Sequence, residues 1–350
     1  MKRKFSRKAL VALFAVSALA LSACSSGDDA SGDVKVSLIL KNQTNPFFVS
    51  MVKGAEAKAA ELGIDLTISS GKEEGDDAAQ IAAIENAISA KHAGIVITVM
   101  STNVNAAITK AREAGLLVIA LDTPTDPADI ADITFATDNR EAGRLIGQWG
   151  AKKLGGQKAV IALLNIFDDR VSPVDYLRDN GFLEGMGIPV NDPNKMADEA
   201  KTGKYSGGDY EIVGNVATGA NEDGGRSGME KLLARNSNIN IVYTINEPTA
   251  IGACAALKAA KKTAIVVSVD GGLSGIEAVK SGCIGATSQQ YPLRMADIGL
   301  QAIYDLVQSG KKPEVTPGKD FFDTGVTLIT DDPQDGVASE TTDYGIENAW

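Results

Sequence analysis

Histidine is almost missing from this sequence, because its 350 residues contain a single one, His92. A Ser-His-Asp triad or a Cys-His pair would have to use that residue. His92 stands in "AKHAGIVITV", where a helix pattern meets a strand pattern, and this position predicts a structural role. The sequence therefore argues against hydrolytic catalysis by either route.

Motifs for metal ions and nucleotide phosphates are missing as well. The three cysteines form no CxxC pair, and one histidine cannot complete a zinc signature. The sequence has no G-x4-G-K-[ST] loop, and "VDGGLSG" (269–275) follows a strand pattern without matching GxGxxG. We expect neither a metal nor a cofactor.

Positive charge is scarce: 34 Lys and Arg stand against 45 Asp and Glu, which gives a formal net charge of −11. Binding to nucleic acid depends on clustered Lys and Arg that neutralise phosphates. An acidic chain instead favours solubility in an exposed location. We therefore expect no nucleic-acid partner.

Long apolar runs are limited to the N-terminus. Residues 1–23 combine the basic "MKRKFSRK" with the short apolar "ALVALFAVSALA", the pattern of a secretory signal peptide. "LSAC" resembles a bacterial lipobox, in which Cys24 becomes the lipidated first residue; an ordinary signal with an incidental cysteine is the alternative. Residues 24–33 are rich in Ser, Gly and Asp, which is typical of a flexible tether.

Cleavage before Cys24 would remove five positive charges and move the net charge from −11 to −16. No other stretch reaches 18 apolar residues. We expect an extracytoplasmic protein, in the periplasm or on the outer face of a bacterial cell, that touches the membrane only through a lipid on Cys24.

The other two cysteines leave a choice open. An exported chain could join Cys254 and Cys283 in a disulfide. However, Cys254 stands in an alanine-rich helix pattern and Cys283 in "SGCIGAT", positions that favour small buried side chains. We favour two free, buried cysteines.

Apolar strand patterns alternate with helix patterns from residue 34 onward. The first unit contains "VKVSLIL" (34–40), "IDLTIS" (64–69), "GIVITV" (94–99) and "LLVIAL" (116–121). A repeat of roughly 25–30 residues is typical of βαβ units, and unbroken apolar runs are typical of parallel strands covered on both faces. After "REAGRLIGQWG" the alternation begins again. The sequence predicts two doubly wound α/β units with a ligand cleft between them.

Polar side chains follow the predicted strands, at the sheet edge where open α/β sheets bind ligands. They are Asn45, Asp122, Asp138, Asn139, Asn246, Asp270, Gln289 and Gln290. Carboxylates accept and amides both accept and donate hydrogen bonds, which suits the vicinal hydroxyls of a sugar, and an aromatic ring could cover its C–H face. Asp and Asn are also common helix caps. We interpret Asp122 and Asp270 as ligand residues and Asp138 as a cap, and leave both roles open for Asn139.

Together these motifs resemble the sugar-binding proteins of bacterial ABC importers, in the ribose-type periplasmic binding family. "NPFF", "LDTP", "ATDN", "NEP", "VDGG" and "ATSQQYP" occur in the family order over residues 34–330. "KTGKYSGGDYEIVGN", "GANEDGGRSGMEKLLA" and "PGKDFFDTGVTLIT" resemble the fructose-type members. The resemblance implies the periplasmic binding protein-like I fold, two Rossmann-like domains joined by a three-stranded hinge.

The resemblance also implies lobe boundaries. The N-terminal lobe would contain 34–136 plus 291–322, and the C-terminal lobe 137–290 plus 323–350. The hinge crossings would lie near 137–139, near 290–292 and within "PGKDFFDTG". An insertion relative to the ribose type would occupy roughly residues 187–210.

By the same resemblance, ligand-binding residues come from both lobes. The implied set is Asn45, Phe47, Phe48, Asp122, Asn139, Tyr176, Arg178, Asn246, Asp270 and Gln290. Phe47 would pack at the cleft edge or stack on the ligand. The family places an arginine on the helix before "GF"; that register holds Tyr176 here, with Arg178 two residues later, so either could be the contact. Ribose-type members carry Arg after the fourth-strand aspartate, whereas Thr123 follows Asp122, which argues against ribose itself.

The function implied is not enzymatic. The protein would be monomeric, bind a monosaccharide, with fructose favoured, and deliver it to the transmembrane subunits of an ABC permease. Ribose, xylose or inositol are alternative ligands. Presentation of the sugar to a chemoreceptor or sensor kinase is an alternative role, and an exported α/β enzyme is a third.

Overall fold

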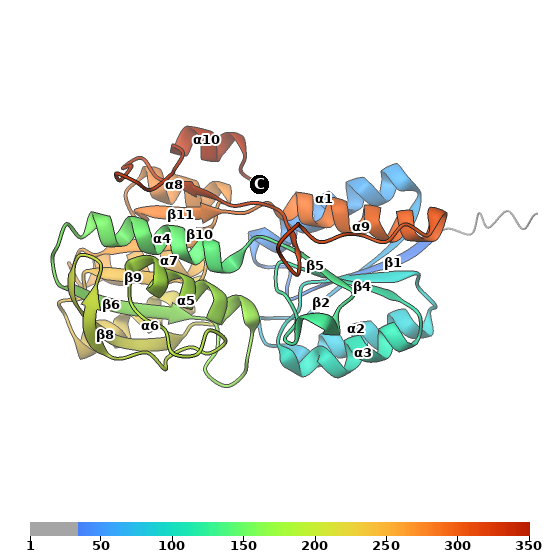
Figure 1. The fold of residues 1–350 in the computed structure, drawn as a ribbon, viewed down its shortest axis with the longest axis horizontal. Coiled ribbons are helices and arrows are strands. Elements are labelled where there is room, and N and C mark those ends of the chain that lie inside the picture. The colour runs from blue at the N-terminus through green and yellow to red at the C-terminus, as the bar shows by residue number, and fades with distance from the viewer. Residues whose placement is uncertain (1–33) are drawn as a thin grey trace, which may run out of the picture. The chain divides into compact units, whose positions relative to one another are not determined.

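Two β-sheets, each covered by helices on both faces, organise the chain (Figure 1). The computed structural model describes residues 34–350. The expected signal peptide (1–23), the tether (24–33) and the lipidation site Cys24 lie outside the described residues. We call the part built on each sheet a lobe.

The sheet of the first lobe has six parallel strands in the order β12-β5-β4-β3-β1-β2. Its strands are β1 (Val34–Leu40), β2 (Ile64–Ser70), β3 (Gly94–Ile97), β4 (Leu117–Leu121), β5 (Ile133–Ala136) and β12 (Phe322–Asp323). Its helices are α1 (Pro46–Leu62), α2 (Asp77–Ser89), η1 (Thr102–Val104), α3 (Asn105–Glu113), η2 (Ala128–Ile130) and α9 (Pro292–Ser309). Helices α1 and α9 pack on one face, and α2 and α3 on the other (Figure 1). Burial from both sides explains why the strands are continuous apolar runs.

The sheet of the second lobe has seven strands in the order β13-β11-β10-β9-β6-β8-β7. Its strands are β6 (Ala159–Asn165), β7 (Thr202–Tyr205), β8 (Gly208–Ala217), β9 (Ile241–Thr244), β10 (Ile265–Asp270), β11 (Ala286–Gln289) and β13 (Thr327–Ile329). Its helices are α4 (Asn139–Lys153), α5 (Pro173–Met186), α6 (Glu222–Arg235), α7 (Glu247–Ala259), α8 (Leu273–Lys280) and α10 (Thr342–Glu347). Helices α4 and α5 cover one face, and α6, α7 and α8 the other (Figure 1).

The edges of the second sheet depart from the wholly parallel arrangement that the sequence predicts. β7 is antiparallel to β8, and β13 is antiparallel to β11. Two residues, Ser206 and Gly207, connect β7 to β8, and so short a connection joins only antiparallel strands. The hairpin lies in the segment expected to be an insertion, where no strand before β8 was predicted.

The side chains of β6 contribute to two hydrophobic cores, one on each face of the sheet. Ile161 and Leu163 belong to the core under α4 and α5, whereas Ala162 and Leu164 belong to the core under α6 and α7. Successive side chains of a strand point to opposite faces, so an unbroken apolar run supplies both layers.

Within residues 34–350 the chain passes between the two sheets at three places. The passages lie between β5 and α4, between β11 and α9, and between β12 and β13. Asp138 caps α4 at the first of them, its side chain accepting a hydrogen bond from the backbone N–H of Glu141.

The two cysteines expected to be free and buried are in fact bonded to each other. Cys254 on α7 and Cys283 after α8 form a disulfide, with their Cα atoms 5.9 Å apart, and both are half-buried. Packing of α7 against α8 brings the two residues within bonding distance. The local sequence around either cysteine does not predict that the two residues lie close together.

His92 lies in the turn between α2 and β3, and it is buried. Its Nδ1 is 2.8 Å from the hydroxyl oxygen of Ser37 on β1. Burial lowers the pKa of His92, because it disfavours the charged imidazolium. The bond between the turn and β1 is the structural role that the sequence predicts.

No helix among residues 34–350 has the length and apolarity to cross a membrane.

Candidate functional site

A small cavity lies where the strand ends of the two lobes face each other. Its volume is about 30 Å³, room for only about two water molecules. Eight of the ten predicted ligand residues line it: Asn45, Phe47, Phe48, Asp122, Arg178, Asn246, Asp270 and Gln290. We call this space the interlobe cavity.

The backbone around the interlobe cavity is strained. Asp122 ends β4 with a φ of 62°, Asp270 ends β10 with a φ of 148°, and Ala220, also on the wall, has a φ of 55°. Non-glycine residues avoid positive φ, and each such residue costs about 1–3 kcal/mol. Strain of this kind concentrates at functional sites. Its presence at both aspartates sets them apart from ordinary strand-end residues.

Arg178 is the centre of the cavity's electrostatics. Its side chain, 4% exposed, extends from α5 and meets an aspartate of each lobe. Nη2 donates to Asp122 Oδ1 at 3.2 Å, and Nη1 lies 3.9 Å from Asp270 Oδ1. Nη1 also donates to the carbonyl of Ile245 at 3.0 Å, and Nε donates to Asn139 Oδ1 at 2.8 Å. One guanidinium therefore joins two buried carboxylates that come from opposite walls.

Besides Arg178, Asp270 has a hydrogen-bond partner in its own lobe. Gln290 Nε2 donates to its Oδ1 at 2.8 Å. Burial raises the pKa of Asp270, and the nearby Arg178 opposes that rise. Behind it, Glu247 accepts hydrogen bonds from the backbone N–H groups of Gly271 and Gly272 at 2.8 and 3.0 Å. These bonds hold the turn after β10 and thereby orient the Asp270 carboxylate.

Phe47 and Phe48 form the aromatic part of the wall at the start of α1. Their rings meet edge to face, with centroids 5.4 Å apart, and both are buried. Asn45 caps the helix by accepting a hydrogen bond from the Phe47 backbone N–H at 3.0 Å. Both rings line the cavity and also belong to the core between α1 and α9.

Asn45 and Asn246 each have two roles: both cap a helix and both line the interlobe cavity. Asn246 caps α7, its Oδ1 accepting from the N–H and the hydroxyl of Thr249, while its Nδ2 donates to the carbonyl of Ala220. Asn45 is a cap as well. Both line the interlobe cavity because a helix that follows a parallel strand begins at the ligand-binding edge of the sheet.

Asn139 and Tyr176 do not line this cavity. Asn139 lies behind Arg178, with its Nδ2 donating to the carbonyl of Asp122 at 2.8 Å. Residues two apart on a helix do not share a face, so only one of Tyr176 and Arg178 can point into the cavity, and packing of α5 selects Arg178. The orientation of α5 thus decides which of the two side chains faces the interlobe cavity.

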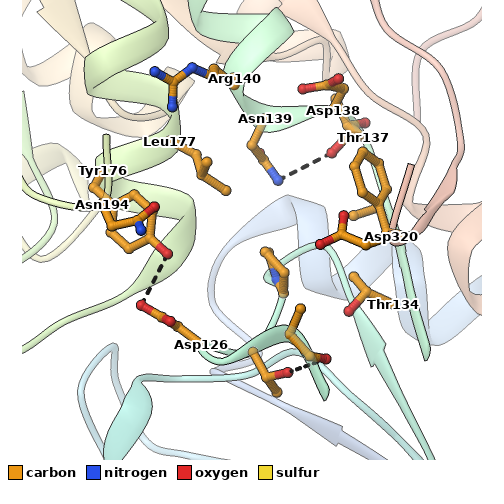
Figure 2. A pocket seen from close by; sticks show the side chains of 15 residues that line it. Asp126, Thr134, Thr137, Asp138, Asn139, Arg140, Tyr176, Leu177, Asn194 and Asp320 are labelled. Atoms are coloured by element: carbon orange, nitrogen blue, oxygen red, sulfur yellow. Dashed lines mark hydrogen bonds between the residues drawn. The ribbon is translucent and has the colours of Figure 1, made fainter. Parts of the chain in front are cut away.

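Tyr176 and Asn139 instead line a second cavity, of about 310 Å³. Figure 2 shows Tyr176 directed toward Asp126, to whose Oδ2 its hydroxyl donates at 3.2 Å. Asn139 is directed toward Thr137, whose carbonyl accepts from its Nδ2. Asp126 belongs to the first lobe and Tyr176 to the second, so this bond crosses between the lobes.

Several residues at the interlobe cavity are not predicted from the sequence. Lys41 and Glu74 form a buried ion pair on its wall, with Nζ and Oε1 3.2 Å apart. Lys41 directly follows β1, so its strand-end position is a usable signal, whereas Glu74 stands in an acidic loop with none. Asp175 does not line the cavity but supports its wall: entirely buried, it accepts hydrogen bonds from the backbone N–H groups of Ile166, a wall residue, and Phe167, and burial raises its pKa to about 7.

Contacts of Arg170 and Val171 with the first lobe, which we call the clasp, join the two lobes beside the cavity. Arg170, in the loop after β6, donates to the carbonyl of Gly75 at 2.7 Å and to Asp77 Oδ2 at 3.1 Å in the first lobe. The carbonyl of the next residue, Val171, accepts from the N–H of Thr102 at 3.1 Å. These contacts hold the lobes in a closed arrangement.

The donor set suits a neutral polar ligand better than a metal ion. In the part of the chain that the structure describes, no three His, Cys, Asp or Glu side chains are grouped so that they could hold a metal ion. Arg178, Asn246 and Gln290 bring donors to the same space as the aspartates. Mixed donors and acceptors match hydroxyl groups, which both donate and accept.

Known proteins resemble this chain over most of its length. The ribose import binding protein RbsB of Haemophilus influenzae is 29% identical over 309 residues, covering 88% of this chain and 96% of that protein. The D-allose-binding periplasmic protein of Escherichia coli is 26% identical over 302 residues, covering 84% of this chain and 91% of that protein.

Solved structures share the arrangement of the lobes. An ABC transporter solute-binding protein from Agrobacterium vitis with bound D-fucose superposes with a TM-score of 0.71 at 26% identity, covering 85% of this chain and 95% of that one. A galactofuranose binding protein superposes with a TM-score of 0.73 at 22% identity, covering 90% and 97%, which shows the shared fold. Residues 36–312 match the family described as periplasmic binding protein domain. With two parallel-sheet lobes and a polar cavity between their strand ends, this chain belongs to the periplasmic binding protein family.

Proposed function

We propose that this protein binds a monosaccharide between its lobes and delivers it to the permease of an ABC importer, with fructose the favoured ligand. The observation that carries the proposal is the pair of strained aspartates, Asp122 and Asp270, which face one buried arginine, Arg178. Phe47 and Phe48 supply an aromatic face beside them. Relatives named for ribose and D-allose, and a structure with bound D-fucose, support a sugar ligand.

Sugar hydroxyls would take over contacts that the side chains now make with one another. Each carboxylate offers about four acceptor positions, so Asp122 can accept from a hydroxyl while it keeps Arg178. Hydrogen bonds to charged groups contribute about 1.5–3 kcal/mol each. A few such bonds together with ring burial are enough for micromolar affinity, about −8 kcal/mol, after the costs of association.

Binding requires the lobes to separate. The interlobe cavity of about 30 Å³ is far smaller than the roughly 300 Å³ of the smallest common ligand pockets. The three passages of the chain between the sheets are the points about which the lobes would rotate. The sugar would enter an open form and be enclosed when the Arg170 clasp re-forms.

The residue after Asp122 bears on the choice of sugar. Thr123 is fully buried, and its hydroxyl donates to Asp122 Oδ2 at 3.0 Å. The resemblance to ribose-type members implies an arginine at this position, which would add a cationic donor. Because Thr123 cannot supply that donor, we favour a ketohexose such as fructose over ribose.

The test is a thermal-shift panel of fructose, ribose, xylose, glucose, galactose and inositol, followed by calorimetry of each sugar that stabilises the protein. We expect fructose to raise the melting temperature most. Stabilisation by none of the six would overturn the monosaccharide proposal, and stabilisation by ribose alone would overturn the preference for fructose. Measured turnover of a bound sugar would contradict the non-enzymatic role.

The anchor and the partner are tested in the source cell. We propose that Cys24 carries the lipid, so Cys24→Ser should abolish labelling with a fatty-acid analogue and release the protein from the membrane fraction. Loss of sugar uptake on deletion of the gene supports delivery to a permease. Retained uptake with lost chemotaxis would favour the sensory role. Size-exclusion chromatography should show a monomer.

A further inference from the structure

Trp350, the last residue of the sequence, is held firmly to the second lobe. It follows α10, which packs on α8, and the carbonyl of Gly345 in α10 accepts a hydrogen bond from Gln289 Nε2 at 2.9 Å. A Cβ atom on Gly272 would lie 3.0 Å from the indole ring. A side chain at that position would crowd the ring, so the glycine allows close packing of Trp350 on the second lobe.

The indole ring also touches the first lobe. It meets the ring of Phe47 edge to face, with centroids 5.4 Å apart and planes at 82°. Phe47 in turn meets Phe48 in the same geometry. Figure 1 marks the C-terminus between α10 and α1, in agreement with this contact. A row of three aromatic rings thus runs from the second lobe to the wall of the interlobe cavity.

A hydrogen bond places the same residue at a passage between the lobes. Trp350 Nε1 donates to the carbonyl of Gln290 at 2.9 Å. Gln290 lies between β11 and α9, and its side chain donates to Asp270. Rotation of the lobes changes the backbone angles at such passages, so Trp350 is bonded to a segment that must move when the cavity opens.

We propose that Trp350 is a positioning residue that couples lobe closure to the placement of Phe47 and Gln290 on the cavity walls. It does not line the cavity, and it acts on the ligand through these two residues. Edge-to-face aromatic pairs and hydrogen bonds to backbone carbonyls each contribute to the closed form. This inference rests on the proposed binding of a sugar.

The first test compares substitutions at the protein's two tryptophans. Trp350→Ala should weaken sugar binding about tenfold or more, mainly through faster dissociation, because it removes an aromatic contact and a hydrogen bond. Trp350→Phe keeps an aromatic ring and should recover part of the affinity. Trp149→Phe is the matched control, since Trp149 also donates to a carbonyl but lies in the core under α4 and α5. A lower melting temperature for Trp350→Ala with unchanged affinity and dissociation rate would overturn the proposal.

The second test uses fluorescence. In Trp149→Phe, tryptophan emission comes from Trp350 alone, because the sequence contains two tryptophans. Addition of the sugar should change that emission, whereas Trp350→Phe should show no sugar-dependent tryptophan signal. Intact binding without an emission change in Trp149→Phe would overturn the coupling.

A third measurement needs no ligand and separates this inference from the choice of sugar. Hydrogen exchange of the ligand-free protein should become faster at Phe47, Phe48 and Gln290 in Trp350→Ala, and stay unchanged there in Trp149→Phe. Unchanged exchange in Trp350→Ala would overturn the positioning role whichever sugar binds. Faster exchange in a protein that binds none of the six sugars would reject the sugar proposal alone.

Discussion

Asp122→Asn is the substitution that tests the site most directly. It keeps the shape of a side chain that is 6% exposed and removes its charge. In the ligand-free protein Arg178 remains partnered, because it still has Asp270, the carbonyl of Ile245 and the amide oxygen of Asn139. The variant should therefore fold, with a modest loss of stability.

The expected loss of affinity follows from the kind of hydrogen bond that changes. A bond to a charged group contributes about 1.5–3 kcal/mol, and a neutral one about 0.5–1.5 kcal/mol. If Asp122 accepts from two hydroxyls, the substitution costs about 2–3 kcal/mol of binding free energy. Since about 1.4 kcal/mol corresponds to a factor of ten, the dissociation constant should rise by about 30- to 150-fold.

The assay is isothermal titration calorimetry with the sugar that gives the largest thermal shift. Asp270→Asn should behave similarly, since that carboxylate also faces the cavity. Asp129→Asn is the matched control, because Asp129 is exposed in η2, away from the cavity. If both Asp122→Asn and Asp270→Asn bind within about threefold of the unmodified protein, the aspartates only hold Arg178, and the assignment of ligand residues is wrong.

Three further substitutions test the electrostatics and the closure. Arg178→Lys should abolish detectable binding and lower the melting temperature, because one ammonium group cannot replace a guanidinium that bonds several partners at once; calorimetry showing near-normal affinity would contradict this. Arg170→Ala removes the two side-chain bonds of the clasp and should speed dissociation about three- to tenfold with little change in association, as measured by stopped flow; an unchanged dissociation rate would show that Arg170 does not hold the lobes closed. Burial raises the pKa of Asp175 from 3.8 to about 7, so the folded protein holds this proton more tightly than the unfolded chain does. The free energy of unfolding should therefore decrease as the pH rises from about 4 to about 7. Asp175→Asn cannot titrate and should show a smaller decrease in urea denaturation between pH 5 and pH 8; equal decreases in both proteins would contradict the assignment.

Much of the fold could be predicted because it depends on local patterns. Continuous apolar strands separated by helical segments predict doubly wound sheets, since a parallel strand must be buried on both faces. The edge hairpin β7–β8 was not predicted, because an edge strand that is exposed over Thr202, Gly203 and Lys204 lacks the apolar pattern of the inner strands.

The candidate site was predictable where a side chain directly follows a strand. Asp122, Asp270 and Gln290 come to the cavity because the carboxyl ends of parallel strands share one edge of the sheet. The positive φ of the two aspartates is visible only in the structure.

The sequence by itself therefore determined the two α/β lobes and the strand-end part of the site, since both follow from residues close together in the chain. Only the tertiary structure decided that Arg178 rather than Tyr176 faces the cavity, because the rotation of α5 is set by packing. It also decided the Cys254–Cys283 bond and the contact of Trp350 with Phe47. These join segments distant in the sequence, and no local pattern records which distant segments meet.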